Sequence, residues 1–186
     1  MRTIHPDVEK ILFNEDQIAE IVRNIGQQIS KDYEGKNLLL VSVLKGSLIF
    51  MSDLMREITV PCAIDFLSVS SYGSGTSTSG EVRILKDLDA SLEGKDVLVV
   101  EDILDSGVTL SYLLKNLSAR HPASIRLCTF LDKPERRRVE VKADYIGAAV
   151  PDEFIVGYGL DYAELYRNLP YVGVLKPSVY TTHEKE

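Results

Sequence analysis

The chain has 186 residues, of which 45% are hydrophobic and 26% are charged, and its formal net charge at pH 7 is -7. This length suits one compact domain, and the apolar content is too high for a disordered chain. The excess of acidic residues disfavours a general nucleic-acid-binding protein, which needs a positive surface, so we expect no nucleic-acid partner.

The sequence also argues against a membrane or secreted protein. No apolar run approaches the length of a membrane span, and the first residues lack the apolar core of a secretion signal. Cys62 and Cys128 lie in apolar runs without the spacing of metal ligands, which favours free thiols. We therefore expect a cytoplasmic protein without a membrane partner.

The first predicted elements are a helix, a strand and a second helix. Apolar residues between positions 15 and 31 recur at helical spacing, and Asn14 with Gln17 has the pattern of a capping box. NLLLVSVL, residues 37–44, is a continuous apolar run typical of a strand buried on both faces. Gly46 then introduces another helical pattern.

Two strands separated by a long loop follow. CAIDFLSVSS, residues 62–71, has the composition of a strand, and EVRILK, residues 81–86, has strand character as well. The intervening residues are small and polar without periodicity, which predicts a flexible loop. A plain hairpin connection is the alternative interpretation of that loop.

The second half of the chain alternates strand and helix patterns again. VLVVEDILDSGVTL, residues 97–110, joins a buried strand to a helix, and SIRLCTFL, residues 124–131, is the next strand. Shorter strands are expected in ADYIGAAV, EFIVGYGLDY and YVGVL. Such repeated units predict a single α/β domain over residues 1–186, with a largely parallel twisted sheet flanked by helices. Sheets of this kind bind ligands at the carboxyl ends of their strands.

The segment VLVVEDILDSGVTL combines two kinds of binding chemistry. Gly107 permits close backbone approach, and the N–H groups of the following helical turn can hold a phosphate without a lysine. Glu101 and Asp102 point to opposite sides if they continue the strand, so they suit sugar hydroxyls or Mg²⁺ better than paired acid-base work. The alternative is that Asp105 or Ser106 only caps the helix and the acids are solvated. The buried strand before them and the helix after them favour a phosphorylated sugar as the ligand.

VLVVEDILDSGVT closely resembles the phosphoribosyl pyrophosphate signature of the type I phosphoribosyltransferases. Other segments resemble the bacterial hypoxanthine-guanine members of that family, and they are VLKGS (43–47), SSYGSGTSTSGEV (70–82), LDKPE (131–135) and VPDEFIVGYGLDYAELYRNLPYVGVL (150–175). The resemblance implies the type I phosphoribosyltransferase fold, with a small hood and a flexible loop. It also implies a Mg²⁺-dependent purine salvage enzyme that acts on a 6-oxopurine and phosphoribosyl pyrophosphate, as a homodimer or homotetramer.

The resemblance assigns the central chemistry to Asp105, as the general base that takes the N7 proton of the purine while N9 attacks the anomeric carbon. Glu101 and Asp102 would bind the ribose hydroxyls and the metal, and Asp161 would lie at the metal or near the purine edge. The residues that would wrap the 5′-phosphate are Asp105, Ser106, Gly107, Val108 and Thr109.

The pyrophosphate would be bound by residues from two distant segments. Lys45 and Gly46 would contact it, and the family often has a cis peptide before this lysine. Arg167 would clamp it with a planar fork of donors. Ser71 and Tyr72 begin the loop that would close over the transition state. Without the resemblance, Lys45 would be a solvated lysine in an ordinary turn, and Arg167 would belong to a surface ion pair.

The purine would be recognised by three residues that follow strands. Lys133 would donate to O6, because an ammonium group has donors only and mismatches the 6-amino group of adenine. Phe154 would stack on the ring, and the backbone of Ile155 would read its edge. Without the resemblance, Lys133 would be expected in solvent and Phe154 in the core.

One position departs from the family pattern, and two other functions stay open. Val108 stands where many relatives have Lys or Arg, so phosphate binding would rely on backbone N–H groups and two hydroxyls. A transferase for xanthine or another base is one alternative, since xanthine differs from hypoxanthine only at the C2 edge. The other is a nucleic-acid-binding regulator that senses phosphoribosyl pyrophosphate with the same fold; the net charge disfavours it.

Overall fold

The computed structural model describes residues 3–71 and 82–181. The strands are β1 Val8–Phe13, β2 Leu38–Leu44, β3 Cys62–Ser71, β4 Val82–Lys86, β5 Asp96–Leu104, β6 Ser124–Asp132, β7 Tyr145–Ala149, β8 Ile155–Val156 and β9 Val172–Leu175. The helices are α1 Glu15–Asp32, α2 Leu48–Glu57, α3 Val108–Ser118 and α4 Pro177–Tyr180, with a 3₁₀ turn at Pro134–Arg136.

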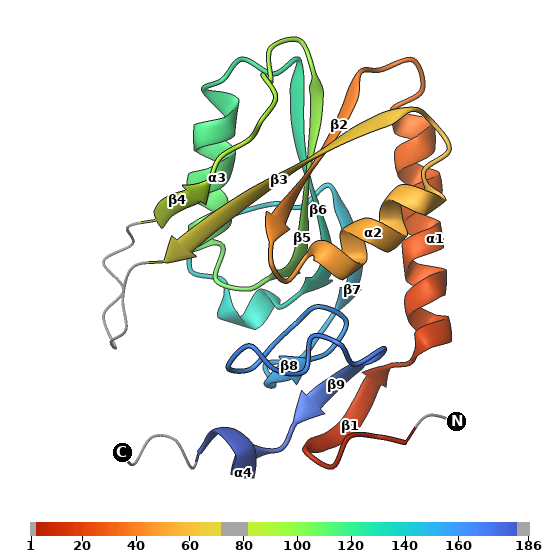
Figure 1. Ribbon diagram of the computed structural model, residues 1–186, viewed down its shortest axis with the longest axis vertical. Coiled ribbons are helices and arrows are strands. Elements are labelled where there is room, and N and C mark those ends of the chain that lie inside the picture. The colour runs from red at the N-terminus through yellow and green to blue at the C-terminus, as the bar shows by residue number, and fades with distance from the viewer. Residues whose placement is uncertain (1–2, 72–81, 182–186) are drawn as a thin grey trace.

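The described strands form two sheets. The larger has six strands in the order β4-β3-β2-β5-β6-β7, and the smaller has three in the order β1-β9-β8. Neighbouring strands of the larger sheet are parallel except for the antiparallel pair β3 and β4. Figure 1 shows the smaller sheet beyond one end of the larger sheet, at the bottom of the view. The predicted α/β fold with a largely parallel sheet and a small hood is therefore confirmed.

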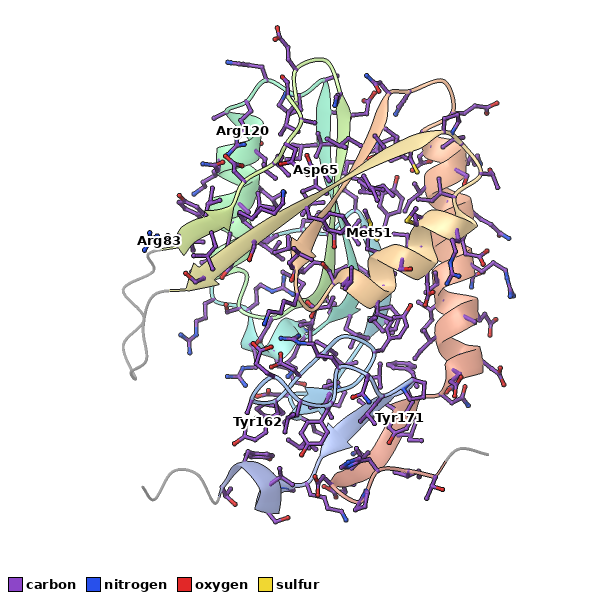
Figure 2. All side chains as sticks on the ribbon, viewed as in Figure 1. Met51, Asp65, Arg83, Arg120, Tyr162 and Tyr171 are labelled. Atoms are coloured by element: carbon purple, nitrogen blue, oxygen red, sulfur yellow. The ribbon has the colours of Figure 1, made fainter. Side chains whose placement is uncertain are left out.

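Alternate residues of the central strands face different helices. In β5, Leu98 and Val100 belong to the core that includes α1 and α2, whereas Val97 and Val99 belong to the core that includes α3. Successive side chains of a strand point to opposite faces of the sheet. All four are fully buried because helices cover both faces. The helices accordingly lie on both sides of the sheet, and Met51 of α2 packs in the first of these cores (Figure 2).

The predicted start of α1 is confirmed in detail. Asn14 Oδ1 accepts a hydrogen bond from Gln17 N at 2.9 Å, and Gln17 Oε1 accepts one from Asn14 N at 2.9 Å. This reciprocal pair is a capping box, which satisfies two backbone donors at the helix start. Among the described residues, no helix is both long and apolar enough to cross a bilayer.

Two buried serines hold the turn between β2 and α2. Ser47 Oγ donates to the carbonyl oxygen of Val43 at 2.5 Å, and it lies 2.7 Å from Ser42 Oγ. Both serines have no exposed surface. The Leu44–Lys45 peptide in this turn is cis, which is the geometry that the resemblance implied.

We expect Ser47→Ala to lower the free energy of unfolding by about 1–3 kcal/mol, because it leaves the buried Ser42 hydroxyl without this partner. Chemical denaturation measures the difference. Ser42→Ala combined with Ser47→Ala should cost less than the sum of the single changes, since the two hydroxyls share one interaction. Ser118→Ala, on the exposed side of α3, is the control. Wild-type stability in Ser47→Ala would show that the serine pair does not stabilise this turn.

Candidate active site

Two cavities meet at the carboxyl end of β5, where both are lined by Ile103 and Asp105. The larger has a volume of about 610 Å³ and extends past the end of β6 to β8, β9 and α4. The smaller has a volume of about 240 Å³ and lies between the end of β2 and the first turn of α3. Small-molecule sites typically measure about 300–1,000 Å³. The cavities are thus in the predicted place, at the carboxyl edge of the parallel sheet.

Most of the predicted site residues line these cavities. Those at the larger cavity are Asp102, Asp105, Lys133, Phe154, Ile155 and Asp161. Those at the smaller cavity are Glu101, Asp105, Ser106, Gly107 and Thr109. Ser71 ends β3 and pairs with Val82, but its side chain, Tyr72 and the predicted flexible loop lie outside the described residues.

Glu101 and Asp102 start from opposite sides of β5, as the two-residue period of a strand requires, but their carboxyl groups come close enough to share a hydrogen bond. Glu101 continues the side that faces α3 and lines the smaller cavity, whereas Asp102 lines the larger cavity. Asp102 also lies against the turn after β2, since a Cβ atom added to Gly46 would be 1.8 Å from Asp102 Oδ2. Only glycine fits at position 46 while Asp102 keeps this place.

The surroundings of the acids disfavour their charged forms. Burial raises the pKa of Glu101 well above its usual value, and the neighbouring Asp102 raises it further. Burial also raises the pKa of Asp102, whereas a hydrogen bond with Glu101 and, to a smaller extent, the Arg167 charge lower it. Within the described ranges, Glu101 Oε2 and Asp105 Oδ1 are buried oxygens without a hydrogen-bond partner. Such oxygens suit a ligand that brings donors or a cation.

The three residues predicted to hold a metal do not meet at one point. No group of three or more Asp, Glu, His or Cys side chains in the described part of the chain is arranged to hold a metal ion. Asp161 is instead engaged by Arg167, with Nη2 and Oδ1 2.9 Å apart, and by the backbone N–H of Glu164 at 2.9 Å. Asp161 is therefore not grouped with Glu101 and Asp102 as the resemblance implied.

The smaller cavity ends at the start of α3. Gly107 precedes the helix with a φ of +79°, and a Cβ there would lie 2.7 Å from the carbonyl oxygen of Val139. No side chain in the described segments caps this helix, and Val108 N is 3.4 Å from Ser106 Oγ, a long hydrogen bond. The first turn of α3 thus offers backbone donors to an anion in this cavity.

The larger cavity reverses two expectations based on the residue types alone. Lys133 is only 6% exposed, and its Nζ donates to the carbonyl oxygen of Glu153 at 2.8 Å. Phe154 is 38% exposed. A buried ammonium group and an accessible aromatic ring at one cavity can bind a flat ligand that carries an acceptor.

Two residues that the sequence did not single out complete the wall around Phe154. The ring of Tyr180 from α4 stacks on Phe154 with centroids 5.1 Å apart, and Tyr162 meets it edge-on at 5.3 Å. Tyr162 lies with Tyr171 in the part of the molecule built around the smaller sheet (Figure 2). No pattern in the sequence indicates these contacts, because they join three separate segments.

Arg136 is another cavity residue that no motif in the sequence indicated. Its Nε lies 3.5 Å from Asp105 Oδ1, and its Nη1 lies 3.5 Å from Asp152 Oδ1. It follows Lys133 by three residues, so the rule that ligands bind just past strand ends could have found it. Asp105 is therefore held beside a cation at the junction of the two cavities.

Lys45 and Arg167 lie at the edge of the site and line neither cavity. Lys45 Nζ is 2.9 Å from Glu164 Oε2. Arg167 lines a separate groove of about 450 Å³ beside α1 and α2, but its Nη2 pairs with Asp161, which lines the larger cavity. These two cations are thus next to the acids of the site.

Comparisons with known proteins agree with this architecture. Residues 9–163 match the model of the phosphoribosyl transferase domain family. The bifunctional protein TilS/HprT of Listeria monocytogenes is 55% identical over 96% of the chain, although the chain spans only 28% of that relative. The hypoxanthine-guanine phosphoribosyltransferase of Staphylococcus aureus is 52% identical, with 96% of this chain and 99% of the relative aligned.

Solved structures give the same result. A hypoxanthine phosphoribosyltransferase from Staphylococcus aureus superposes with a TM-score of 0.92 at 52% identity, over 95% of this chain and 96% of the other. The hypoxanthine phosphoribosyl transferase of Trypanosoma cruzi superposes with a TM-score of 0.94 at 43% identity, over the whole of both chains. The sheet order, the cavities at the carboxyl ends of the strands and these similarities together show that the chain belongs to the phosphoribosyltransferase family.

Proposed function

We propose that this protein joins hypoxanthine, and also guanine, to phosphoribosyl pyrophosphate, giving the purine nucleoside monophosphate and pyrophosphate. The observation that carries the proposal is the place of Asp105, at the junction of a cavity with Lys133 and Phe154 and a cavity at the start of α3. The first cavity suits a purine, and the second suits the sugar phosphate. The activities named for the Staphylococcus aureus relative and for the Staphylococcus aureus structure support the same substrates.

In this proposal the larger cavity orients the base. Lys133 donates a hydrogen bond to O6, Phe154 stacks on the ring, and the backbone of Ile155 meets the purine edge. Asp105 accepts the N7 proton as N9 attacks the anomeric carbon. Lys133 Nζ donates one hydrogen bond to the carbonyl oxygen of Glu153, and this contact fixes the position of the ammonium group. Its other two N–H donors are then oriented before the base binds.

The smaller cavity binds the ribose phosphate. The start of α3 and the hydroxyls of Ser106 and Thr109 bind the 5′-phosphate, with Val108 contributing its backbone N–H. Glu101 and Asp102 accept hydrogen bonds from the ribose hydroxyls. Lys45, Gly46 and Arg167 bind the pyrophosphate, and the loop that begins at Ser71 and Tyr72 excludes water.

The acids also fit a Mg²⁺ ion that arrives with the substrate. Mg²⁺ is commonly held by one or two carboxylates together with substrate oxygens, so two acids and a phosphate-bearing ligand suffice. The buried Glu101 Oε2, which has no hydrogen-bond partner among the described residues, is suited to such an ion directly or through water. Asp161 would not contact the ion directly while it pairs with Arg167. When bound, the ion neutralises charge on the departing pyrophosphate.

We extend the proposal to a single phosphoribosyltransferase domain over residues 1–186, to a homodimer or homotetramer, and to a cytoplasmic location. These statements rest on the family resemblance and on the length and composition of the chain. The oligomeric state can be measured by light scattering during gel filtration.

The experiment that tests the function is an assay of pyrophosphate release. Purified protein with Mg²⁺ and phosphoribosyl pyrophosphate should consume hypoxanthine and guanine and leave adenine unreacted, because Lys133 offers only donors to the 6-position. Xanthine belongs in the panel, since it differs at the C2 edge. Consumption of adenine without hypoxanthine would contradict the proposal. Salt-dependent nucleic-acid binding without turnover would favour the regulator.

A further inference from the structure

A single carboxylate oxygen lies between the two cations that the proposed function assigns to pyrophosphate. Glu164 Oε2 is 2.9 Å from Lys45 Nζ and 3.5 Å from Arg167 Nη2. Lys45 comes from the turn after β2, 119 positions earlier in the chain than Glu164. The site therefore already contains an anionic oxygen at the point where Lys45 and Arg167 approach each other.

The backbone around Glu164 holds it in this place. Ala163, Glu164 and Tyr166 have φ angles of +50°, +67° and +73°, a region that residues other than glycine rarely adopt. Paired backbone hydrogen bonds of 3.2 and 3.0 Å between Tyr162 and Leu165 close the turn. The loop backbone, and not burial of the side chain, fixes Glu164, since that side chain is 65% exposed.

The charges at this edge of the site balance without a ligand. Arg167 pairs with both Asp161 and Glu164, and Lys45 pairs with Glu164, so two cations face two carboxylates. A polyphosphate that binds both cations must displace at least one of these acids. Glu164 is the easier one to displace, because its side chain is 65% exposed and that of Asp161 is 30% exposed.

We infer that Glu164 is an internal counter-ion of the pyrophosphate subsite: it holds Lys45 and Arg167 together, and pyrophosphate takes its place on both. The inference rests on the proposed function, which assigns Lys45 and Arg167 to pyrophosphate. Glu164 thereby weakens the binding of pyrophosphate, as substrate group and as product, and favours its release. It acts through the two cations and is not itself a catalytic residue.

Calorimetric titration with inorganic pyrophosphate at fixed excess Mg²⁺ tests the inference. Glu164→Gln removes the charge and keeps the size of the side chain, so we expect pyrophosphate to bind about 2- to 10-fold more tightly, the scale of two partly exposed ion pairs. The gain in pyrophosphate affinity caused by Glu164→Gln should be smaller in a Lys45→Met background, because Glu164 then competes with pyrophosphate for one cation and not for two. A residue with a purely structural role would weaken binding and would show no such dependence on Lys45.

Glu135→Gln is the matched control. Glu135→Gln makes the same change in net charge as Glu164→Gln. Glu135 is exposed, lies two residues from Lys133, and pairs with neither Lys45 nor Arg167 in the described part of the chain. Equal tightening in Glu135→Gln, or unchanged or weaker binding in Glu164→Gln, would overturn the inference. The titration needs no purine. If the wild-type protein turns over hypoxanthine but Glu164→Gln does not tighten pyrophosphate binding, only this inference is wrong. If Glu164→Gln tightens pyrophosphate binding but no base is turned over, only the proposed function is wrong.

Discussion

Asp105→Asn is expected to lower kcat for hypoxanthine by about 10²- to 10⁴-fold, the usual contribution of a general base. The amide has the shape of the carboxylate but cannot accept the N7 proton. The backbone around residue 105, which begins the phosphate turn, should be unchanged, so the KM for phosphoribosyl pyrophosphate should stay close to the wild-type value. Steady-state kinetics with each substrate varied in turn separates the two constants.

Asp152→Asn is the control for this prediction. Asp152 and Asp105 have nearly the same exposure, 45% and 44%, and each lies 3.5 Å from a nitrogen of Arg136. Loss of a carboxylate beside Arg136 is thus common to both variants, but only Asp105 lies at the junction of the two cavities. Because Asp152 Oδ1 also lies 3.9 Å from Lys133 Nζ, the preference for hypoxanthine over adenine is measured in both variants. A similar fall of kcat in both, with that preference unchanged, would show that the pairing with Arg136, and not proton transfer, accounts for the effect of Asp105→Asn.

The elements that depend on local pattern could be predicted from the sequence. Asn14 and Gln17 determine where α1 begins, and the apolar run of residues 37–44 gives β2 within one residue. β1 was not predicted, because its sequence VEKILF does not alternate between apolar and polar residues; in the structure only Val8 of this strand is buried. That strand is stabilised by antiparallel pairing with β9, more than 150 residues away, which no local pattern can reveal.

In the candidate site, too, some features follow from local sequence and others depend on tertiary packing. Gly107 and the acids of β5 lie on one continuous segment, so their spacing predicted a turn with free backbone donors next to carboxylates at the end of a strand. The environment of Lys133 and Phe154 could not be predicted from residue type. Whether a lysine is buried or a phenylalanine exposed depends on how β6 and β8 meet, which is a tertiary property. The contact of Glu164 with Lys45 was missed for the same reason.

The distribution of charge is compatible with the proposed binding of a phosphorylated sugar at an acidic segment. Glu101 and Asp102 at the end of β5 and Asp105 just after it supply three carboxylates and no cation, and the positive side chains come from other elements. Lys133 follows β6, Lys45 follows β2 and Arg167 lies in the loop before β9. Lys133 pairs with the carbonyl oxygen of Glu153, whereas Lys45 and Arg167 share Glu164, so in the proposed function the base and the pyrophosphate meet separate cations. Substitution of one cation should therefore affect one substrate group more than the others.

Lys133→Met tests this separation. We expect kcat/KM for hypoxanthine to fall by about 10- to 100-fold, the scale of a lost charge-assisted hydrogen bond to O6 in a buried site. Methionine has a similar length and fills the same buried space without a donor. The affinity for pyrophosphate should change much less, since Lys133 lines the cavity of the base and Lys45 and Arg167 do not.

A comparison of hypoxanthine with adenine as substrates tests this prediction most directly. Adenine lacks the 6-oxo acceptor, and Lys133 is the donor that distinguishes the two bases. The ratio of kcat/KM for hypoxanthine to kcat/KM for adenine should therefore fall in Lys133→Met. Lys142→Met, at an exposed position in the segment before β7, is the control and should retain the wild-type ratio. An unchanged preference for hypoxanthine in Lys133→Met would mean that backbone groups near Ile155 distinguish the 6-substituent, and the assignment of Lys133 to O6 would be wrong.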